Sequence, residues 1–398
     1  MSRRDSCRAA PDCLRLPAME MQEAVDRAES LGELISDNAA TGEADRRVAQ
    51  DVIDAVADAR LFEVAVPTSL GGHGLGIDAL AEVTRTMGRA CPATAWTVSF
   101  LMLHAWLVSK LPAEGVEELF AQTAAPLAAA PLAPTGTAEP TDGGYVVNGR
   151  WEWATGSAHS GWLIAHALES GPELATRFVV LPMSEVTVDD VWFTAGMRAT
   201  GSNTVEVHDR FVPAHRTIGS RELLDSTGEV PGDGLAGIPV ISALALVAAA
   251  PALGGAERAA QEYRDRLAQR VLAYTLGDKA VEQPAAQMRL ATVQDTVSTA
   301  AARWRQAIAA VGDTEAPGFD ERVDARLAAV SVVRTSRQAI STACEGAGAS
   351  VYFETHPLQR IQRDVETLKG HVIFDWDRTT ELAGRHLLGL EPRVTDMV

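Results

Sequence analysis

The stretch YVVNGRWEWATGSAHSGWLIAHALE, residues 145–169, decides the fold class of this chain. Its two ends are rich in β-branched and aromatic residues, and glycine and serine separate them, which is typical of short β-strands joined by turns. Three similar runs follow, TRFVVLPM (176–183), VTVDDVWF (186–193) and NTVEVHDRFVP (203–213). We therefore expect a small antiparallel β domain in the middle of the chain.

The sequence before this region has helical periodicity. Apolar residues recur at helical spacing from Glu20 to about Phe62, which predicts two amphipathic helices. The glycines of PTSLGGHGLG (67–76) then predict a loop. Further helices are expected over residues 77–90, 93–111 and 113–123.

Helical periodicity returns after about Gly234. The expected helices there cover residues 237–250, 254–275, 284–312, 319–345 and 357–388, the last in one or two pieces. Gly346 is the expected end of the helix over 319–345. The order of helices, strands and helices predicts an α+β fold, because the βαβ alternation of a parallel sheet is missing.

We divide the chain into four parts on this basis. They are a disordered extension (1–18), an N-terminal helical domain (19–123), a β domain (124–233) and a C-terminal four-helix bundle (234–398). The motifs GxGxxG, GxxxxGK[ST], HExxH and GxSxG are absent, so common nucleotide, metalloprotease and serine-hydrolase sites are not indicated.

Composition excludes several classes of function. A formal net charge of −18 without a long basic run disfavours nucleic-acid binding. The four cysteines are too scattered for a disulfide framework or a zinc site, and no other metal site is indicated. The longest apolar run, 239–253, is shorter than a membrane span, and Arg3 and Arg4 precede no signal-like apolar segment. We expect a cytoplasmic protein without a membrane partner.

Five stretches, in this order, resemble the acyl-CoA dehydrogenase fold. They are VPTSLGGHG (66–74), ATAWTVSFLMLHAWLVSKLP (93–112), GRWEWATGSAHSGW (149–162), GMRATGSNTVEVHDRFVP (196–213) and GAGASVYFETHPLQRIQRDVETLKGH (346–371). The resemblance is closer to the group D flavin-dependent monooxygenases of this fold, the oxygenase components of two-component aromatic hydroxylases. It covers residues 19–392 and implies a bound reduced FMN or FAD.

The stretch WEWATGS matches a family corner of the form Trp-x-Ser/Thr that lies beside the flavin ring. The match assigns the hydroxyl near the flavin N5 and O4 edge to Thr155, and it places Trp153, Gly156 and Ser157 along the same edge. Without the other motifs, the same residues would be a Thr-Gly turn that ends a strand.

Three further residues are cofactor candidates from the same resemblance. Ser202 and Asn203, in TGSNT, either contact the flavin or shape their own turn. Arg270 matches an arginine that reaches a flavin phosphate, often across a subunit interface, and its alternative is a solvated charge at a helix surface.

The stretch RDVETLKGHVIFDWD (363–377) separates two activities of this fold. In many acyl-CoA dehydrogenases the segment runs from an Arg-Asp pair to a Tyr-Glu whose glutamate abstracts a proton. Aligning Arg363 and Asp364, an expected ion pair, places His371 at the tyrosine and Val372 at the glutamate. Valine cannot accept a proton, which weakens the dehydrogenase hypothesis, although some dehydrogenases keep the base on another helix.

The hydroxylase branch instead has one histidine in this region and one in the N-terminal helices. His371 and His104 match them, and an imidazole suits proton transfer near neutral pH. Taken alone, His104 would be a core histidine and His371 a helix-surface residue. Most of the eight tryptophans are expected in the core, with contact to an aromatic substrate as the alternative for Trp106.

The resemblance implies a monooxygenase that hydroxylates a phenolic or polycyclic aromatic substrate with O2 through a C4a-hydroperoxyflavin. His104, His371 and Thr155 would be the catalytic residues. A separate NAD(P)H:flavin reductase would supply the reduced flavin, because no nicotinamide motif is present, and the family predicts a homotetramer. An acyl-CoA dehydrogenase, an amino-sugar N-oxygenase (nitrososynthase) and a non-catalytic flavin-binding protein stay open as alternatives.

Overall fold

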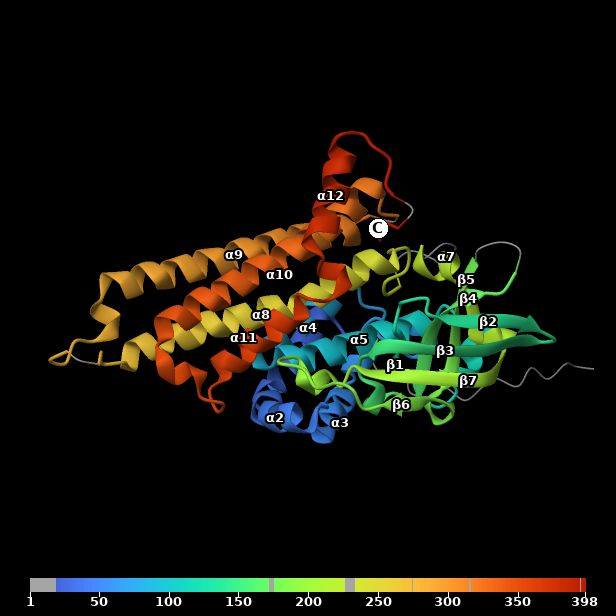
Figure 1. Cartoon of the computed structure of the whole chain (residues 1–398), viewed down its shortest axis with the longest axis horizontal. Helices are drawn as coiled ribbons and strands as arrows, with labels where there is room; N and C mark the ends of the chain where they lie inside the picture. The colour runs from blue at the N-terminus through green and yellow to red at the C-terminus, as the bar shows by residue number, and fades with distance from the viewer. Residues whose placement is uncertain (1–18, 172–174, 226–232, 274, 315, 394) are drawn as a thin grey trace, which may run out of the picture.

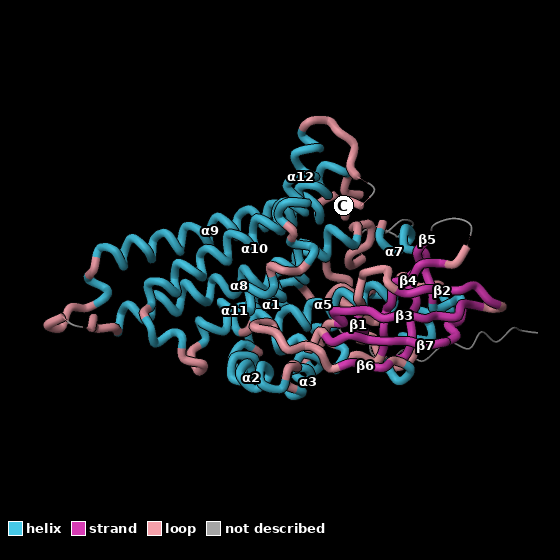
Figure 2. Tube along the Cα trace, viewed as in Figure 1, coloured by secondary structure: helices cyan, strands magenta, loops and turns pink. Residues whose placement is uncertain are grey.

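The computed structural model describes residues 19–398 except 172–174, 226–232, 274, 315 and 394, so the proposed extension 1–18 lies outside it. Strands gather at one end of the molecule and long helices extend to the other (Figures 1 and 2). The predicted α+β order of helices, strands and helices is confirmed. All strands of the described chain lie between residues 128 and 219, and the exact domain limits stay a prediction.

The N-terminal region is helical up to Phe120. Its α-helices are α1 (Met21–Ser30), α2 (Gly32–Asp45), α3 (Gln50–Asp58), α4 (Ile77–Ala90), α5 (Pro92–Val108) and α6 (Ala113–Phe120). The prediction of two helices before Phe62 was wrong, because the chain turns at Leu31 and separates α1 from α2. The loop predicted at 67–76 is confirmed, with one short 3₁₀ turn, Thr68–Leu70.

An eight-stranded sheet follows. Its strands are β1 (Ala128–Ala129), β2 (Gly136–Thr141), β3 (Gly144–Ala154), β4 (Trp162–Glu169), β5 (Ala175–Pro182), β6 (Thr187–Asp189), β7 (Asn203–Pro213) and β8 (Thr217–Gly219). The order is β6-β7-β3-β2-β4-β5-β8, with β1 beside β4. The sheet is mostly antiparallel, but β4 pairs in parallel with both β1 and β2, so the expectation of a wholly antiparallel domain was too simple.

Long helices form the C-terminal region. They are α8 (Val240–Gln269), α9 (Pro284–Gly312), α10 (Phe319–Ala347), α11 (Pro357–Leu368) and α12 (Trp376–Leu387), and a short helix α7 (Ser220–Leu224) precedes them. The prediction of separate helices over 237–250 and 254–275 was wrong, because α8 continues through Pro251. Every residue from Val240 to Ala256 is buried, and this packing offsets the one backbone hydrogen bond that proline cannot make. The α10 helix ends at Ala347 and is followed by Gly348, two residues after the predicted stop at Gly346.

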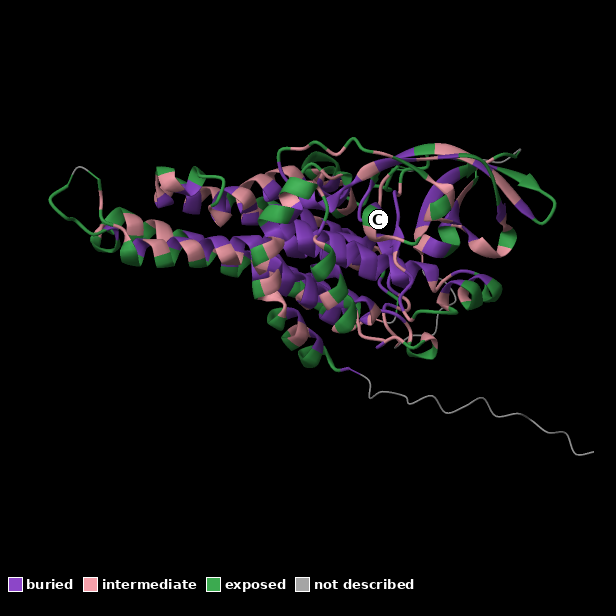
Figure 3. Ribbon diagram, turned by 90° about the horizontal axis from the view of Figure 1, so that it is seen from below, coloured by how far each residue is buried: buried purple, intermediate pink, exposed green. Residues whose placement is uncertain are grey.

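Buried residues concentrate in the centre of the molecule, whereas the outer helices carry exposed stripes (Figure 3). By length and hydropathy α8 is able to cross a membrane, but 89% of its most apolar window is buried within the protein. We therefore describe α8 as the central core helix. Helix α5 is buried along its whole length, which places its side chains in contact with both the sheet and the C-terminal helices.

Candidate active site

The corner between β3 and β7 is the first part of the site. The pairing of these strands shifts register between Trp151 and Ala154, and Trp153 takes a positive φ of 64°. A bulky residue rarely adopts this conformation. It turns the Trp153 ring outward, where 58% of the residue is exposed, and it starts the tight turn in which the Thr155 amide donates to the Trp153 carbonyl at 2.8 Å.

Hydroxyl groups fill the inside of this corner. Thr155 Oγ1 lies 2.8 Å from Ser202 Oγ, which lies 2.8 Å from Thr200 Oγ1. Gly156 has a φ of 71°, and a Cβ there would lie 3.3 Å from Leu101 of α5. Its amide donates to the Thr200 carbonyl at 3.1 Å. The amides of Thr155 and Gly156 are thus occupied by protein acceptors, and the Thr155 hydroxyl is a polar group that a ligand can approach.

Two other predicted cofactor residues have clear structural surroundings. Ser157 is buried and begins the 3₁₀ turn Ser157–His159. Asn203 Oδ1 accepts hydrogen bonds from the amides of Val191 and Trp192, both at 3.0 Å. This shapes the loop between β6 and β7, which is the second of the two roles considered for Asn203.

His104 lies in the C-terminal half of α5 and is 2% exposed. Its Nδ1 lies 2.7 Å from the carbonyl oxygen of Ala128. A carbonyl only accepts, so the proton is on Nδ1, and Nε2 of the neutral ring keeps a lone pair. Burial lowers the pKa of His104 to about 4, with partial opposition from the Ala128 hydrogen bond. His104 is therefore a neutral hydrogen-bond acceptor and a potential proton acceptor at neutral pH.

His371 lies in the connection between α11 and α12, not on a helix surface. Its Nδ1 accepts a hydrogen bond from the Ile373 amide at 3.2 Å and so caps the 3₁₀ turn Val372–Phe374. The ring proton is therefore on Nε2, the opposite tautomer to His104. Burial, and then the positive charge of Arg326, lower the pKa of His371 to about 4. His371 is a neutral hydrogen-bond donor through Nε2.

The two histidines meet at a cluster of aromatic rings. The Phe100 ring centroid lies 5.6 Å from that of His104 and 6.4 Å from that of His371. Trp96 lies 4.6 Å from Phe100 and 5.3 Å from His371, and Phe374 lies 6.2 Å from His371. The structure thus brings together the two histidines that the sequence separates by 267 positions.

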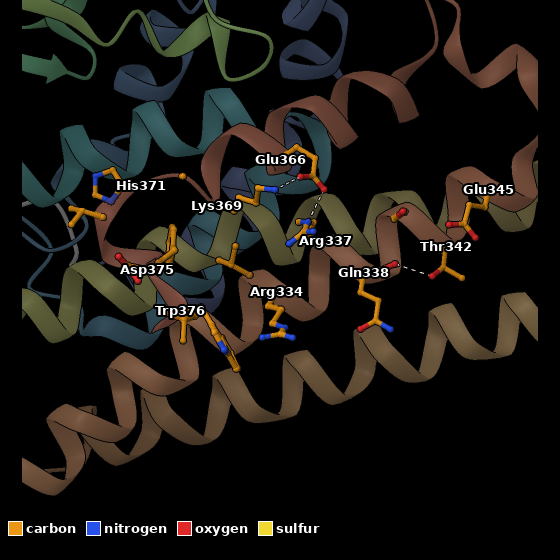
Figure 4. A pocket seen from close by; sticks show the side chains of 16 residues that line it. Arg334, Arg337, Gln338, Thr342, Glu345, Glu366, Lys369, His371, Asp375 and Trp376 are labelled. Atoms are coloured by element: carbon orange, nitrogen blue, oxygen red, sulfur yellow. Dashed lines mark hydrogen bonds and ion pairs between the residues drawn. The ribbon is translucent and has the colours of Figure 1, made fainter. Parts of the chain in front are cut away.

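A groove of about 880 Å³ runs along α10 and the α11–α12 connection, with His371 at one end and Glu345 near the other (Figure 4). Its volume is in the range of small-molecule and cofactor sites. The lining is partly apolar and partly charged: Val330, Val333, Arg334, Arg337, Glu345, Glu366, Lys369, Val372, Phe374, Asp375 and Trp376.

The carboxylates near His371 are engaged with other groups. Glu366 pairs with Lys369 at 2.6 Å and with Arg337 at 2.7 Å (Figure 4). Asp375 caps α12 by accepting from the Arg378 amide at 3.0 Å. Because both carboxylates are engaged in these contacts, neither is a free base.

Arg270 ends α8, where its Nη1 donates to the Gly346 carbonyl at 3.0 Å. This end of α8 is remote from the sheet (Figure 1). Within one chain Arg270 therefore does not join the corner at Thr155, and its phosphate contact across a subunit interface stays a prediction.

Other sequence predictions near the site need correction. Arg363 and Asp364 do not pair with each other: Arg363 pairs with Glu43 of α2, and Asp364 accepts from the Met197 amide at 2.6 Å. Trp106 is 2% exposed, and the Lys110 ammonium lies 4.3 Å from its ring centroid, so Trp106 belongs to the core.

Sequence reasoning missed Trp96, Phe100 and Thr200. Trp96, Phe100 and His104 are spaced four residues apart on α5, and this spacing alone places them on one helix face. Thr200 had no comparable signal. Among the described residues, no group of three or more histidine, cysteine, aspartate or glutamate side chains has the arrangement of a metal site.

Comparison with known proteins identifies the family of this chain. Residues 20–131 match the family described as "Acyl-CoA dehydrogenase, N-terminal domain", and residues 246–376 match "Acyl-CoA dehydrogenase, C-terminal domain". The oxygenase subunit HsaA of a flavin-dependent monooxygenase from Mycobacterium tuberculosis is 30% identical over 371 residues, covering 90% of this chain and 93% of HsaA. The chain belongs to the flavin-dependent monooxygenases of the acyl-CoA dehydrogenase fold.

Two other relatives cover nearly the whole chain. A pigment production hydroxylase from a Rhodococcus species is 30% identical over 378 residues, which cover 92% of this chain and 97% of that protein. The structure of XiaF from Streptomyces sp., in complex with FADH2 and glycerol, matches with a TM-score of 0.90 and 28% identity over 95% of this chain and 98% of XiaF.

Membership in this family defines the class of enzyme. The chain is the oxygenase component of a two-component flavin-dependent monooxygenase that hydroxylates aromatic substrates. Such a component uses reduced flavin that a separate flavin reductase provides.

Proposed function

We propose that the monooxygenase hydroxylates a phenolic or polycyclic aromatic substrate held between His104 and His371, beside a reduced flavin at the Thr155 corner. The observation that carries this proposal is the pair of neutral imidazoles in opposite tautomers that both lie near the Phe100 ring. One offers a lone pair and the other offers an N–H.

His104 is the proton acceptor in this proposal. Its Nδ1–H is held by the Ala128 carbonyl, so Nε2 is available to accept the proton of a phenol. Removal of that proton places negative charge on the aromatic ring and makes its ortho and para carbons nucleophilic. Burial keeps the imidazole neutral and ready to accept.

His371 is the hydrogen-bond donor in this proposal. With Nδ1 occupied by the Ile373 amide, Nε2–H is available to an oxygen atom of the substrate or of the reacting oxygen species. Bound reduced flavin supplies the activation of O2. The protein holds the partners in place and excludes water with the rings of Trp96, Phe100 and Phe374.

The surroundings favour an aromatic substrate over the other candidates. The rings around His371 offer faces and edges to an aromatic group, whereas the hydroxyls of an amino sugar would lose hydrogen bonds to water there. A dehydrogenase would require a free carboxylate base, and Glu366 and Asp375 are engaged elsewhere.

The residues present fit a flavin, and the choice between FMN and FAD belongs to this proposal. The exposed ring of Trp153 offers a face for the flavin, the buried hydroxyl of Thr155 offers a polar contact, and the groove that ends at His371 is large enough for a cofactor or substrate. Both cofactors fit this description. A homotetramer, in which Arg270 of one chain serves another, and a cytoplasmic location also stay proposals.

A product assay tests the function. The protein is mixed with anaerobically reduced FMN or FAD and a panel of phenols, then with oxygenated buffer, and hydroxylated product and hydrogen peroxide are measured. The proposal expects product with at least one phenol, and little product from a His104→Gln/His371→Gln variant. Absence of product from every phenol, or anaerobic reduction of bound flavin by an acyl-CoA, would contradict it.

A further inference from the structure

Three buried hydroxyls form a continuous hydrogen-bonded chain that ends on a backbone carbonyl. Thr155 Oγ1, Ser202 Oγ and Thr200 Oγ1 follow one another at 2.8 Å, and Thr200 Oγ1 lies 2.9 Å from the carbonyl oxygen of Met197. The exposed fraction of these residues rises along the hydroxyl chain, from 2% at Thr200 through 4% at Ser202 to 8% at Thr155. The Thr155 end is therefore the end that a ligand approaches.

The carbonyl fixes the direction of every hydrogen bond in this chain. A carbonyl oxygen only accepts, so the single hydroxyl proton of Thr200 is donated to the Met197 carbonyl oxygen. Ser202 must then donate to Thr200, and Thr155 must donate to Ser202. Thr155 Oγ1 is left with no proton for a ligand, and it faces the ligand as a pure hydrogen-bond acceptor.

The carbonyl that sets this direction is held firmly. Trp192 Nε1 also donates to the Met197 carbonyl at 2.9 Å, and Asp364 Oδ1 of α11 accepts from the Met197 amide at 2.6 Å. The preceding Gly196 packs so closely on α11 that a Cβ would overlap the Arg363 carbonyl. Both the amide and the carbonyl of Met197 are thus held, so the orientation of the carbonyl that accepts from Thr200 is fixed.

We infer that Ser202 is a specificity-determining residue that makes this site prefer reduced over oxidised flavin, because it orders Thr155 as an acceptor. The inference rests on the proposed function for the placement of the flavin N5 edge at Thr155. N5 of reduced flavin carries a hydrogen and donates, whereas N5 of oxidised flavin presents a lone pair. An acceptor matches the first and opposes the second.

The preference matters for a two-component enzyme. Reduced flavin arrives from another protein and oxidised flavin must leave after each cycle. A site that accepts a hydrogen bond from N5–H retains the reduced flavin, which reacts with O2, and releases the oxidised flavin.

The test measures dissociation constants of reduced and oxidised flavin, FMN and FAD separately, under anaerobic conditions. Ser202→Ala removes the acceptor for the Thr155 proton, so Thr155 regains the ability to donate to oxidised N5. We expect the ratio of the two dissociation constants to change about tenfold toward oxidised flavin, the size of one hydrogen bond made or lost. The midpoint potential of bound flavin should fall by about 30 mV, the two-electron equivalent.

Two more variants sharpen the test. Thr200→Val removes the anchor from the far end of the chain and should shift the ratio in the same direction, which guards against a local defect at Ser202. Ser160→Ala is the matched control, because the Ser160 hydroxyl lies in the same corner but donates to the Gly156 carbonyl at 2.9 Å outside the chain. Its ratio should equal that of the wild type.

The outcomes separate this inference from the proposed function. If the wild type binds flavin and Ser202→Ala leaves both the ratio and the potential unchanged, the ordering of Thr155 does not select the redox state. If the wild type binds neither form of either flavin, the proposed function itself is wrong.

Discussion

The corner at Thr155 and the histidine cluster at Phe100 both use hydrogen bonds to backbone groups, but these bonds leave different groups available to a ligand. At the corner, each hydroxyl uses its only proton within the protein, and the direction of the chain is set by one carbonyl. In the cluster, each imidazole uses one nitrogen on the backbone and keeps the other for a ligand. The corner therefore fixes Thr155 as a hydrogen-bond acceptor, whereas the cluster leaves imidazole nitrogens that can accept or donate a proton.

The origin of the two regions differs as well. The corner is formed by strands that pair directly, β3 and β7, and by the loop before β7. The cluster joins α5 to the connection between α11 and α12, which are far apart in sequence. The strands of the first region were therefore predictable from local sequence, while the second region depends on how the helices pack.

The largest effect is expected at His104. His104→Gln keeps the volume but removes the basic Nε2, so hydroxylation of a phenol should fall about 100-fold, the range of one acid–base group. Binding of reduced flavin, which we propose to take place at the Thr155 corner, should stay within a few-fold of wild type. His208→Gln, at an exposed position, is the control. A variant with full activity would show that His104 is a core residue only.

A smaller effect is expected at His371. His371→Ala removes the donor, and the reacting oxygen should be lost as hydrogen peroxide more often. We expect the fraction of flavin oxidation that yields product to fall about tenfold, as for the loss of a charge-assisted or strong hydrogen bond at the reacting atom. The assay compares product with peroxide over a single turnover. An unchanged ratio of product to peroxide would remove His371 from the chemistry.

Asp364 connects the two regions and gives a prediction in stability. The carboxyl is 3% exposed, and burial is the main cause that raises its pKa from 3.8 to about 7. The hydrogen bond from the Met197 amide and the charges of Arg363 and Arg360 oppose this shift, and the charge of Glu43 adds to it. The Asp364 carboxyl in turn raises the pKa of Cys91. A raised pKa means that the folded protein holds the proton more tightly than the unfolded chain.

Because folding raises the pKa of Asp364, the stability of the protein falls as the pH rises. The stability from protonated Asp364 is fully present below about pH 4 and is lost as the pH rises through about 7. Asp364→Asn stays uncharged and keeps an oxygen for the Met197 amide. The free energy of unfolding of the wild type relative to this variant should therefore fall by about 2 kcal/mol between about pH 5 and pH 8, measured by urea titration. Equal pH slopes would mean that Asp364 does not titrate in this range.

Much of the fold was predictable because its periodicity is local. The strand runs around Trp151 and the helices over 77–90 and 284–312 were found from composition and spacing alone. The errors have tertiary causes. Burial on all sides carries α8 through Pro251, and the parallel pairing of β4 depends on contacts that no local pattern encodes.

The site was predictable to a lesser degree. Resemblance selected His104, His371 and Thr155, and the structure places the two histidines around one ring. The role of Asp364 and the tautomers of the two histidines could not be predicted from the sequence, because they depend on which backbone groups lie opposite each side chain. The assignments of flavin contacts, Arg270 included, stay predictions.

The most direct test of the account is the protonation state of the two histidines. Selectively ¹⁵N-histidine-labelled protein, assigned with the His104→Gln and His371→Gln variants, reports each tautomer through its side-chain nitrogen shifts. At about pH 6 the account predicts two neutral rings, with the proton on Nδ1 of His104 and on Nε2 of His371. A charged ring at either position, or the same tautomer at both, would contradict it.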